Sequence, residues 1–205
     1  MNLKWIWWVF ENAIHPEICN RIIDVMQQSK KERASVGFTK NKKNLTKKDQ
    51  IKFDKTRKSY VCFSNEKWMY RTIHPWIHKA NEMAGWNFQW DHSESIQLTQ
   101  YTPGEFYTWH CDSWPEPYVE EGPFKGKIRK LSSVLALNDS SEYEGGKLEF
   151  SFMGDNLKKK YSSSESMLKK GSIIVFPSFV WHRVSPVTKG TRYSMTNWHC
   201  GKPFI

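Results

Sequence analysis

GSIIVFPSFVWHRVSPVTKGTRYSMTNW, residues 171–198, is the stretch that decides the fold class. A buried-type strand at residues 173–176 leads into a Pro-Ser turn and a second strand that contains His182. After a turn at residues 188–190, a third strand begins at Arg192. Short strands between tight turns are typical of antiparallel sandwiches and barrels. Hairpin geometry would place His182 and Arg192 on neighbouring strands.

Two helices are expected before this strand-rich half. Pro16 opens the first, and apolar side chains follow it at helical spacing as far as residue 28. The second helix would start from a cap at Ser64 or Asn65, kink or divide at Pro75 and stop at Gly85. Other strands are expected at residues 5–10, 59–63, 95–101, 106–110, 130–137 and 147–151. The sequence therefore predicts a mainly β protein with flanking helices packed on one sheet.

The length of 205 residues suits one substantial core. We expect a single domain over residues 1–205, with an N-terminal supporting part at 1–90 and a barrel core at 91–200. The four cysteines show no Cys-x-x-Cys spacing, so reduced thiols are expected. No stretch approaches the roughly 20 apolar residues that a transmembrane helix needs. A soluble, cytoplasmic protein with no membrane partner is the expectation.

The charge of the chain is strongly positive and unevenly distributed. Lys and Arg total 31 against 21 acidic residues, which gives a formal net charge of +10. Residues 30–58 alone hold twelve basic residues and only three acidic ones. Such a segment is either a solvated loop or a surface for a polyanion or an acidic protein.

A metal site is suggested by three side chains. Residues two apart in a strand point to the same face, so His110 and Asp112 can reach one ion together. His182 completes a set of two imidazoles and one carboxylate, which holds non-haem Fe(II) and leaves coordination positions open. Arg192 adds a charged fork suited to a dicarboxylate. A His-x-Asp pair alone often arises by chance, so the metal site is predicted from His110, Asp112, His182 and Arg192 together.

Three blocks of sequence in a fixed order carry a family resemblance. They are Tyr101-Thr-Pro-Gly104-Glu-Phe-Tyr107-Thr-Trp-His110-Cys-Asp112, then Leu137-Asn138 with Tyr143-Glu-Gly145-Gly146-Lys-Leu148-Glu-Phe150, and then His182 with Arg192-Tyr-Ser-Met-Thr196-Asn-Trp198. Over roughly residues 95–199 the chain resembles the iron- and 2-oxoglutarate-dependent oxygenases, specifically the prolyl 4-hydroxylase-like branch. The resemblance implies a double-stranded β-helix, which is a jelly-roll core.

The resemblance also implies roles for individual residues. The expected ligands of Fe(II) are His110, Asp112 and His182, and Arg192 would pair with the distal carboxylate of 2-oxoglutarate. The other expected contacts of the co-substrate pocket are Tyr101, Thr196 and Trp198. Packing in the core is the alternative interpretation of Tyr101 and Trp198.

Other residues near these motifs have less specific interpretations. Tyr107 is expected to pack in the core, and Arg129 to form a surface ion pair first and a substrate contact second. Some relatives offer a Tyr to the distal carboxylate from the strand that ends in Leu-Asn. Val134, Leu135 and Ala136 stand there in this chain, so a second contact to that carboxylate is not identified.

The activity implied by the resemblance is hydroxylation of a prolyl residue at C4 in a protein or peptide. Dioxygen and 2-oxoglutarate would be consumed, succinate and CO2 released, and ascorbate would act as reductant. In relatives, the segment between the first helix and the core strands forms a lid over the peptide. Residues 30–58 occupy this place, and their charge favours an acidic peptide or a ribosomal protein.

Three alternatives remain open from the sequence. A nucleic-acid dealkylating oxygenase would suit the positive charge, but such enzymes carry a second Arg about six residues after the co-substrate Arg, where this chain has Trp198. A non-catalytic, basic jelly-roll module that binds nucleic acid would not need the three ligands together with Arg192. A cupin-like metal isomerase would not need Arg192.

Overall fold

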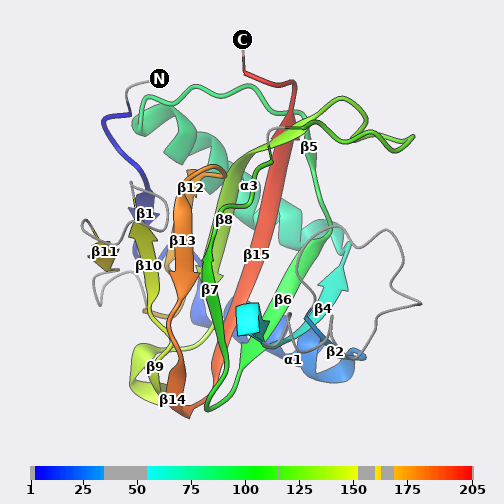
Figure 1. Cartoon of the computed structure of the whole chain (residues 1–205). Helices are drawn as coiled ribbons and strands as arrows, with labels where there is room; N and C mark the ends of the chain where they lie inside the picture. The colour runs from blue at the N-terminus through cyan, green and yellow to red at the C-terminus, as the bar shows by residue number, and fades with distance from the viewer. Residues whose placement is uncertain (1–2, 35–54, 115, 152–159, 163–168, 205) are drawn as a thin grey trace.

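The computed structural model describes residues 3–34, 55–114, 116–151, 160–162 and 169–204. Two antiparallel sheets lie face to face, and the helices cover the outer face of the larger sheet (Figure 1). This arrangement is a double-stranded β-helix with few helices, so the predicted fold class is confirmed. Its organisation as a single domain stays a prediction.

The larger sheet has eight strands and carries the helices. Its strand order is β1 (Trp8–Phe10), β12 (Ile173–Pro177), β8 (Ile128–Ala136), β15 (Arg192–Gly201), β6 (Ile96–Tyr101), β4 (Tyr60–Ser64) and β2 (Glu32–Arg33), with β5 (His92–Ser93) paired to β15. The smaller sheet has the order β11 (Lys160–Ser162), β10 (Leu148–Ser151), β13 (Trp181–Val184), β7 (Phe106–His110) and β3 (Arg57–Lys58). A separate pair is formed by β14 (Val187–Gly190) and β9 (Tyr143–Gly145), which follows a short 3-10 helix at Ser140–Glu142.

Side-chain alternation along the strands separates a helix-facing side of the larger sheet from a cavity-facing side. On β12, Ile173 and Val175 belong to the cluster under the helices, whereas Ile174 and Phe176 belong to the cluster between the sheets. On β15 the even-numbered residues from Arg192 to Trp198 line a cavity between the sheets. A shift of one residue in the pairing of β15 would therefore remove its polar side chains from that cavity.

The helices α1 (Pro16–Gln28) and α3 (Lys67–Met83) bury one face each against the larger sheet. Among the largest fully buried side chains are Ile22 on α1 and Ile73 and Ile77 on α3, and each contributes about 1.5–3 kcal/mol by its burial. None of the described helices combines the length and the hydropathy that crossing a membrane requires.

Two details of α3 differ from the sequence-based expectation. Pro75 lies inside one continuous helix and does not divide it. Because Ile73 and Ile77 are buried on either side of Pro75, tertiary packing compensates for the hydrogen bond that proline cannot donate. The expected cap at Ser64 or Asn65 is also wrong, since the N-cap residue is Glu66 and no side chain caps it.

A buried polar network lies between α3 and the larger sheet. The hydroxyl of Ser93 lies 3.1 Å from Nε2 of His74 and 2.9 Å from Nδ1 of His199. The second nitrogen of His199 lies 3.4 Å from the hydroxyl of Ser133 on β8. His199 is fully buried, and its pKa lies well below the ordinary value because of burial first and the nearby His74 and His78 second.

Stability is therefore expected to fall as the pH drops below roughly 6.5, the ordinary pKa of histidine. The imidazole of His199 is neutral when folded and takes a proton when unfolded, so its contribution is present above this pH and lost below it. Urea unfolding between pH 5 and 8 measures how the free energy of unfolding changes with pH. His199→Gln should reduce this slope by about 1.4 kcal/mol per pH unit below roughly pH 6.5. An identical slope in the variant would contradict this assignment.

Candidate metal and co-substrate site

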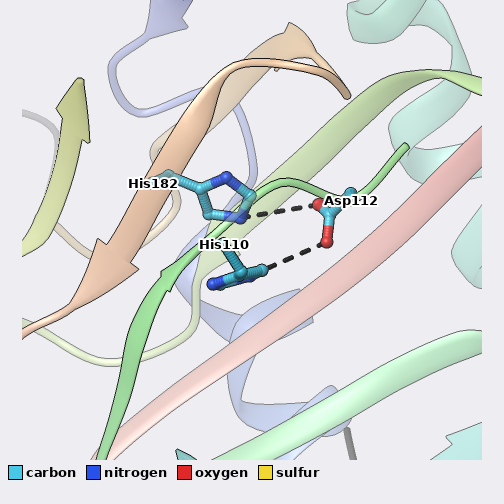
Figure 2. A group of neighbouring side chains, drawn as sticks. All are labelled: His110, Asp112 and His182. Carbon is cyan, nitrogen blue, oxygen red and sulfur yellow. Dashed lines mark ion pairs between the residues drawn. The ribbon is translucent and has the colours of Figure 1, made fainter. Parts of the chain in front are cut away.

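Three potential metal ligands converge at one end of the smaller sheet. His110 is the last residue of β7, and it pairs directly with His182 of β13 in the sheet register. Nε2 of His110 lies 3.8 Å from Oδ1 of Asp112, and Nε2 of His182 lies 3.5 Å from Oδ2 (Figure 2). The ligand atoms of all three residues lie within 4.8 Å of one another. Two neighbouring strands and the chain just beyond one of them therefore present a single ligand set.

The two imidazoles are held in the form that binds a metal. Nδ1 of His110 lies 2.8 Å from the carbonyl oxygen of Thr108, and Nδ1 of His182 lies 2.9 Å from that of Val180. Because a carbonyl only accepts, each Nδ1 carries a hydrogen, and Nε2 is the nitrogen that each ring presents toward Asp112. Burial first and the neighbouring His182 second lower the pKa of His110 to about 3, so its ring is neutral near pH 7.

Asp112 supplies the negative charge of the site. Its side chain is buried, which by itself raises the pKa of the carboxyl, but His182, His110 and Arg129 lower it and the net shift is downward. An ionised carboxylate beside two imidazole lone pairs suits a divalent cation of the iron type. The chemistry of the donor set therefore fits Fe(II).

The cavity in front of this ligand set has a volume of about 540 Å³. Arg192 lies in its wall with 3% of its surface exposed, donates to the hydroxyl of Ser194 at 3.2 Å, and faces the ring of Tyr101. No carboxylate pairs with this guanidinium among the residues that the structure describes. A buried charge requires a partner, so the cavity is suited to an anion.

The other residues expected in the co-substrate pocket also line this cavity. Tyr101 comes from β6, and Thr196 and Trp198 come from β15 beside Arg192. The cavity thus brings together all seven residues that the sequence predicted for the site. Their individual roles stay predictions.

A second unpaired guanidinium in the cavity wall was missed by the sequence analysis. Arg57 on β3 is 6% exposed, and its side-chain contacts within the described part of the chain are the hydroxyl of Ser59 and the ring of Tyr107. Its position in a Lys-rich segment made it look like a solvated residue. The antiparallel pairing of β3 with β7 places it inside instead.

Tyr107 does more than pack in the core. Its ring stacks on the imidazole of His110 with 3.5 Å between centroids, and the guanidinium of Arg57 lies over the same ring at 4.6 Å. Burial raises the pKa of the Tyr107 phenol, so its hydroxyl stays protonated. The expectation that Tyr107 is only a packing residue is therefore incomplete, because its ring lines the cavity.

The predicted placement of His182 and Arg192 on neighbouring strands is wrong. The chain between them forms β14, which leaves both sheets to pair with β9. β13 consequently lies in the smaller sheet and β15 in the larger one, and the two residues reach the cavity from opposite walls. Cys111 also lines the cavity, because β7 ends at His110 and strict side-chain alternation ends with it.

Arg129 was expected to form an ion pair at the surface, but its side chain is largely buried. Its Nε and Nη2 donate to the two carboxylate oxygens of Glu94 at 2.6 Å each, and its guanidinium lies 4.0 Å from the ring of Trp198. The side chains of Arg129 and Glu94 are only 12% and 19% exposed, and both line the cavity. Glu94 lies between β5 and β6, where no sequence motif distinguished it.

Gly146 makes room for Arg192. A Cβ atom added at Gly146 would lie 2.9 Å from Cδ of Arg192 and 2.9 Å from Cγ2 of Val187, and the residue has a φ of +59°. Gly146→Ala should therefore displace the guanidinium and destabilise the fold by about 1–2 kcal/mol.

Isothermal titration of the metal-loaded protein should show a several-fold weaker affinity for 2-oxoglutarate in Gly146→Ala. The affinity for Mn(II) should stay unchanged, because Gly146 does not contact the ligand set. Equal losses for both ligands would argue against a specific effect on Arg192. Gly104, which has nothing within 4 Å of an added Cβ and also has a positive φ, offers the matched control Gly104→Ala.

A double-stranded β-helix with two imidazoles, a carboxylate and an unpaired guanidinium in one cavity defines a class, the non-haem iron oxygenases with a dicarboxylate co-substrate. Residues 96–200 match the family model described as "2OG-Fe(II) oxygenase superfamily". The chain belongs to this superfamily. The family and the His-Asp-His cluster together support Fe(II) and 2-oxoglutarate as cofactor and co-substrate.

Several proteins of similar sequence are PKHD-type hydroxylases. One, from Synechococcus sp. (strain CC9902), is 35% identical over 104 residues, which are 51% of this chain and 40% of that protein. Another, from Xylella fastidiosa (strain M12), is 41% identical over 68 residues, which are 33% of this chain and 26% of that protein. The matched region is thus less than half the length of these relatives.

Solved structures with the same fold include prolyl hydroxylases. A Pseudomonas putida prolyl-4-hydroxylase superposes with a TM-score of 0.65 at 17% identity, covering 96% of this chain and 93% of that one. A prolyl hydroxylase from Trichoplax adhaerens, in complex with a peptide fragment of the hypoxia inducible factor oxygen degradation domain, gives 0.65 at 16% identity, covering 95% and 83%. At these identities the likeness concerns the fold.

Proposed function

We propose that the protein is an Fe(II)- and 2-oxoglutarate-dependent dioxygenase that hydroxylates a prolyl residue at C4 in a protein or peptide. Dioxygen is the oxidant, succinate and CO2 are the by-products, and ascorbate serves as reductant. The observation that carries the proposal is that one cavity holds both the His-Asp-His cluster and the buried Arg192, which has no carboxylate partner among the described residues. The PKHD-type relatives and the prolyl hydroxylase neighbours support the choice of substrate.

The residues of the chain bind and orient in this proposal. His110, Asp112 and His182 hold Fe(II), which when bound supplies the oxidising chemistry that no side chain of the site can supply. Arg192 pairs with the distal carboxylate of 2-oxoglutarate and so fixes the direction in which the co-substrate lies. The rings of Tyr101, Tyr107 and Trp198 line the cavity in which the co-substrate is bound.

The alternatives carry less support. In place of the second Arg of the dealkylating enzymes stands Trp198, whose ring packs against the Arg129 guanidinium. A binding module without catalysis has no use for two imidazoles, a carboxylate and a guanidinium that lacks a carboxylate partner among the described residues, all in one cavity. The hydroxylase accounts for all four groups.

The direct test incubates the protein with Fe(II), 2-oxoglutarate, ascorbate and a host-cell protein extract. Mass spectrometry of tryptic peptides should show a gain of one oxygen, about 16 Da, on proline. Omission of 2-oxoglutarate should abolish the gain. Succinate production without any oxidised prolyl peptide would reject proline as the substrate and keep the oxygenase, whereas no succinate at all would reject both.

For the substrate we further propose an acidic peptide, or a protein bound close to nucleic acid such as a ribosomal protein. The support is the positive charge of residues 30–58 and the unpaired Arg57 in the cavity wall. The lysines at positions 40, 42, 43, 47 and 48 lie outside the described residues, so the proposal rests on their charge alone.

Reversal of these five lysines to glutamate should raise KM for the oxidised peptide and leave KM for 2-oxoglutarate unchanged. The increase should shrink at high ionic strength, because salt screens the interaction between charges and shortens the screening length from about 8–10 Å to about 3 Å at 1 M. Steady-state kinetics at two salt concentrations measure both effects. Unchanged peptide kinetics would contradict a role of this segment in substrate recognition.

A further inference from the structure

The carboxylate of Asp112 lies where the strand no longer supports it. β7 ends at His110, so Asp112 is outside the sheet ladder that positions the two imidazoles. Its main chain is held by one carbonyl, because the amides of Asp112 and Ser113 donate to the oxygen of Ser178 at 2.8 and 3.0 Å. The turn that contains Ser178 therefore holds the main chain at Asp112 in place of the strand.

The side chain of Asp112 accepts a hydrogen bond from one buried hydroxyl, and a second buried hydroxyl supports the first. Oγ of Ser132 on β8 donates to Oδ2 of Asp112 at 2.8 Å, and Oγ of Ser178 lies 2.9 Å from Oγ of Ser132. The hydroxyl of Ser132 has one hydrogen, which it donates to the carboxylate of Asp112. The hydroxyl of Ser178 is therefore the donor in the hydrogen bond between the two serines. Both serines are fully buried. The result is a chain of two hydrogen bonds, from Ser178 to Ser132 to Asp112, that ends on one carboxylate oxygen.

The same turn also fixes a second ligand. It connects β12 with β13, and the carbonyl of Val180 within it orients the ring of His182. The amide of Ser178 donates to the carbonyl of Lys130 at 3.0 Å, which fastens the turn to β8. Ser178 therefore joins three separate parts of the site, namely the end of β7, the strand β8 and the approach to His182.

We propose that Ser132 and Ser178 are positioning residues for the metal ligand Asp112. Their hydroxyl pair fixes the rotation of the carboxylate, so that Oδ2 faces His182 and is held by the protein while Oδ1 faces His110. A carboxylate free to rotate would present both oxygens to the metal in varying ways and bind it less firmly. The inference rests on the proposed iron site and is independent of the substrate.

The test uses Mn(II), which takes the same nitrogen and oxygen ligands as Fe(II). Ser132→Ala should raise the Kd for Mn(II) by roughly 10–100-fold, the range found when a partner that orients a ligand is removed. Electron paramagnetic resonance of free Mn(II) measures the Kd. Ser178→Ala should raise it by a smaller factor, because Ser132 can still donate to the carboxylate.

The matched control is Ser133→Ala on the same strand. Ser133 is also buried, but it points to the other face of the sheet, where it contacts the carbonyl of Asn197 and the ring of His199. Its loss should affect thermal unfolding of the metal-free protein and leave the Kd for Mn(II) unchanged. A metal-binding change confined to Ser132 and Ser178 then separates positioning from general stability.

Equal Kd values for Ser132→Ala and Ser133→Ala would overturn the proposal. If Ser132→Ala does not fold, Ser178→Ala provides the test, because alanine at position 178 retains all the main-chain hydrogen bonds of the turn. An unchanged Kd for Mn(II) in Ser178→Ala would then overturn the proposal. Mn(II) binding is measured without 2-oxoglutarate or peptide. A protein that binds Mn(II) as expected but never consumes 2-oxoglutarate would contradict the proposed function and leave this inference intact.

Discussion

Replacing His182 with alanine is expected to weaken binding of Fe(II) by more than about 100-fold, since even partners that only orient a ligand are worth roughly 10–100-fold. His182 is one of only three ligands in the described cluster, and its ring is buried and already oriented by the Val180 carbonyl. The rings of Phe150 and Phe176, which offer no ligand atom to a metal, lie beside the His182 ring.

Anaerobic titration with Fe(II) and 2-oxoglutarate provides the measurement. The wild-type protein should develop a weak visible charge-transfer band, and His182→Ala should show none. His78→Ala is the matched control, since His78 lies on α3, stacks on Trp90 and is remote from the cavity. A band of equal strength in His182→Ala would remove the residue from the ligand set, and no band in the wild type would refute the oxygenase.

The second large effect is expected at Arg192. Removal of one partner of a buried, hydrogen-bonded charge pair costs about 2–5 kcal/mol, so Arg192→Gln should raise KM for 2-oxoglutarate by at least about 30-fold. Arg192→Lys should retain part of the affinity, because lysine keeps the charge and loses the planar fork. The affinity for Mn(II) should not change in either variant, because Arg192 is not part of the ligand cluster.

Arg183→Gln is the control for this experiment. Arg183 follows His182 directly on β13, but it points away from the cavity and pairs with Glu149. Its loss should leave KM for 2-oxoglutarate unchanged. If Arg192→Gln and Arg183→Gln behave alike, the distal carboxylate binds elsewhere, and Arg57 becomes the next guanidinium to test.

The sequence predicted the strands of the core with good accuracy where polar and apolar residues alternate between turns. β7 has the expected bounds, β13 contains His182 as predicted, and β15 begins at Arg192 as predicted. The start of α3 was predicted wrongly because no side chain caps its first turn. The predicted division of α3 at Pro75 was wrong because packing outweighs local helix preference.

The candidate site was predictable to the extent that its residues lie in recognisable motifs. His110, Asp112, His182 and Arg192 stand in ordered blocks, so their presence in one cavity followed from the sequence. Arg57, Glu94, Ser132 and Ser178 lie outside such motifs and come from four different parts of the chain. Only the pairing of strands brings them to the same place.

The sequence by itself determined the donor atoms of this protein, since two imidazoles, a carboxylate and a guanidinium are properties of residue types. It also determined the strand periodicity that turns the two imidazoles and the guanidinium inward. The tertiary structure alone decided which wall of the cavity each occupies and which hydroxyl holds Asp112. The reason is physical: β14 pairs with β9 and so sends β13 and β15 into different sheets, and such long-range pairing is set by the packing of the whole chain.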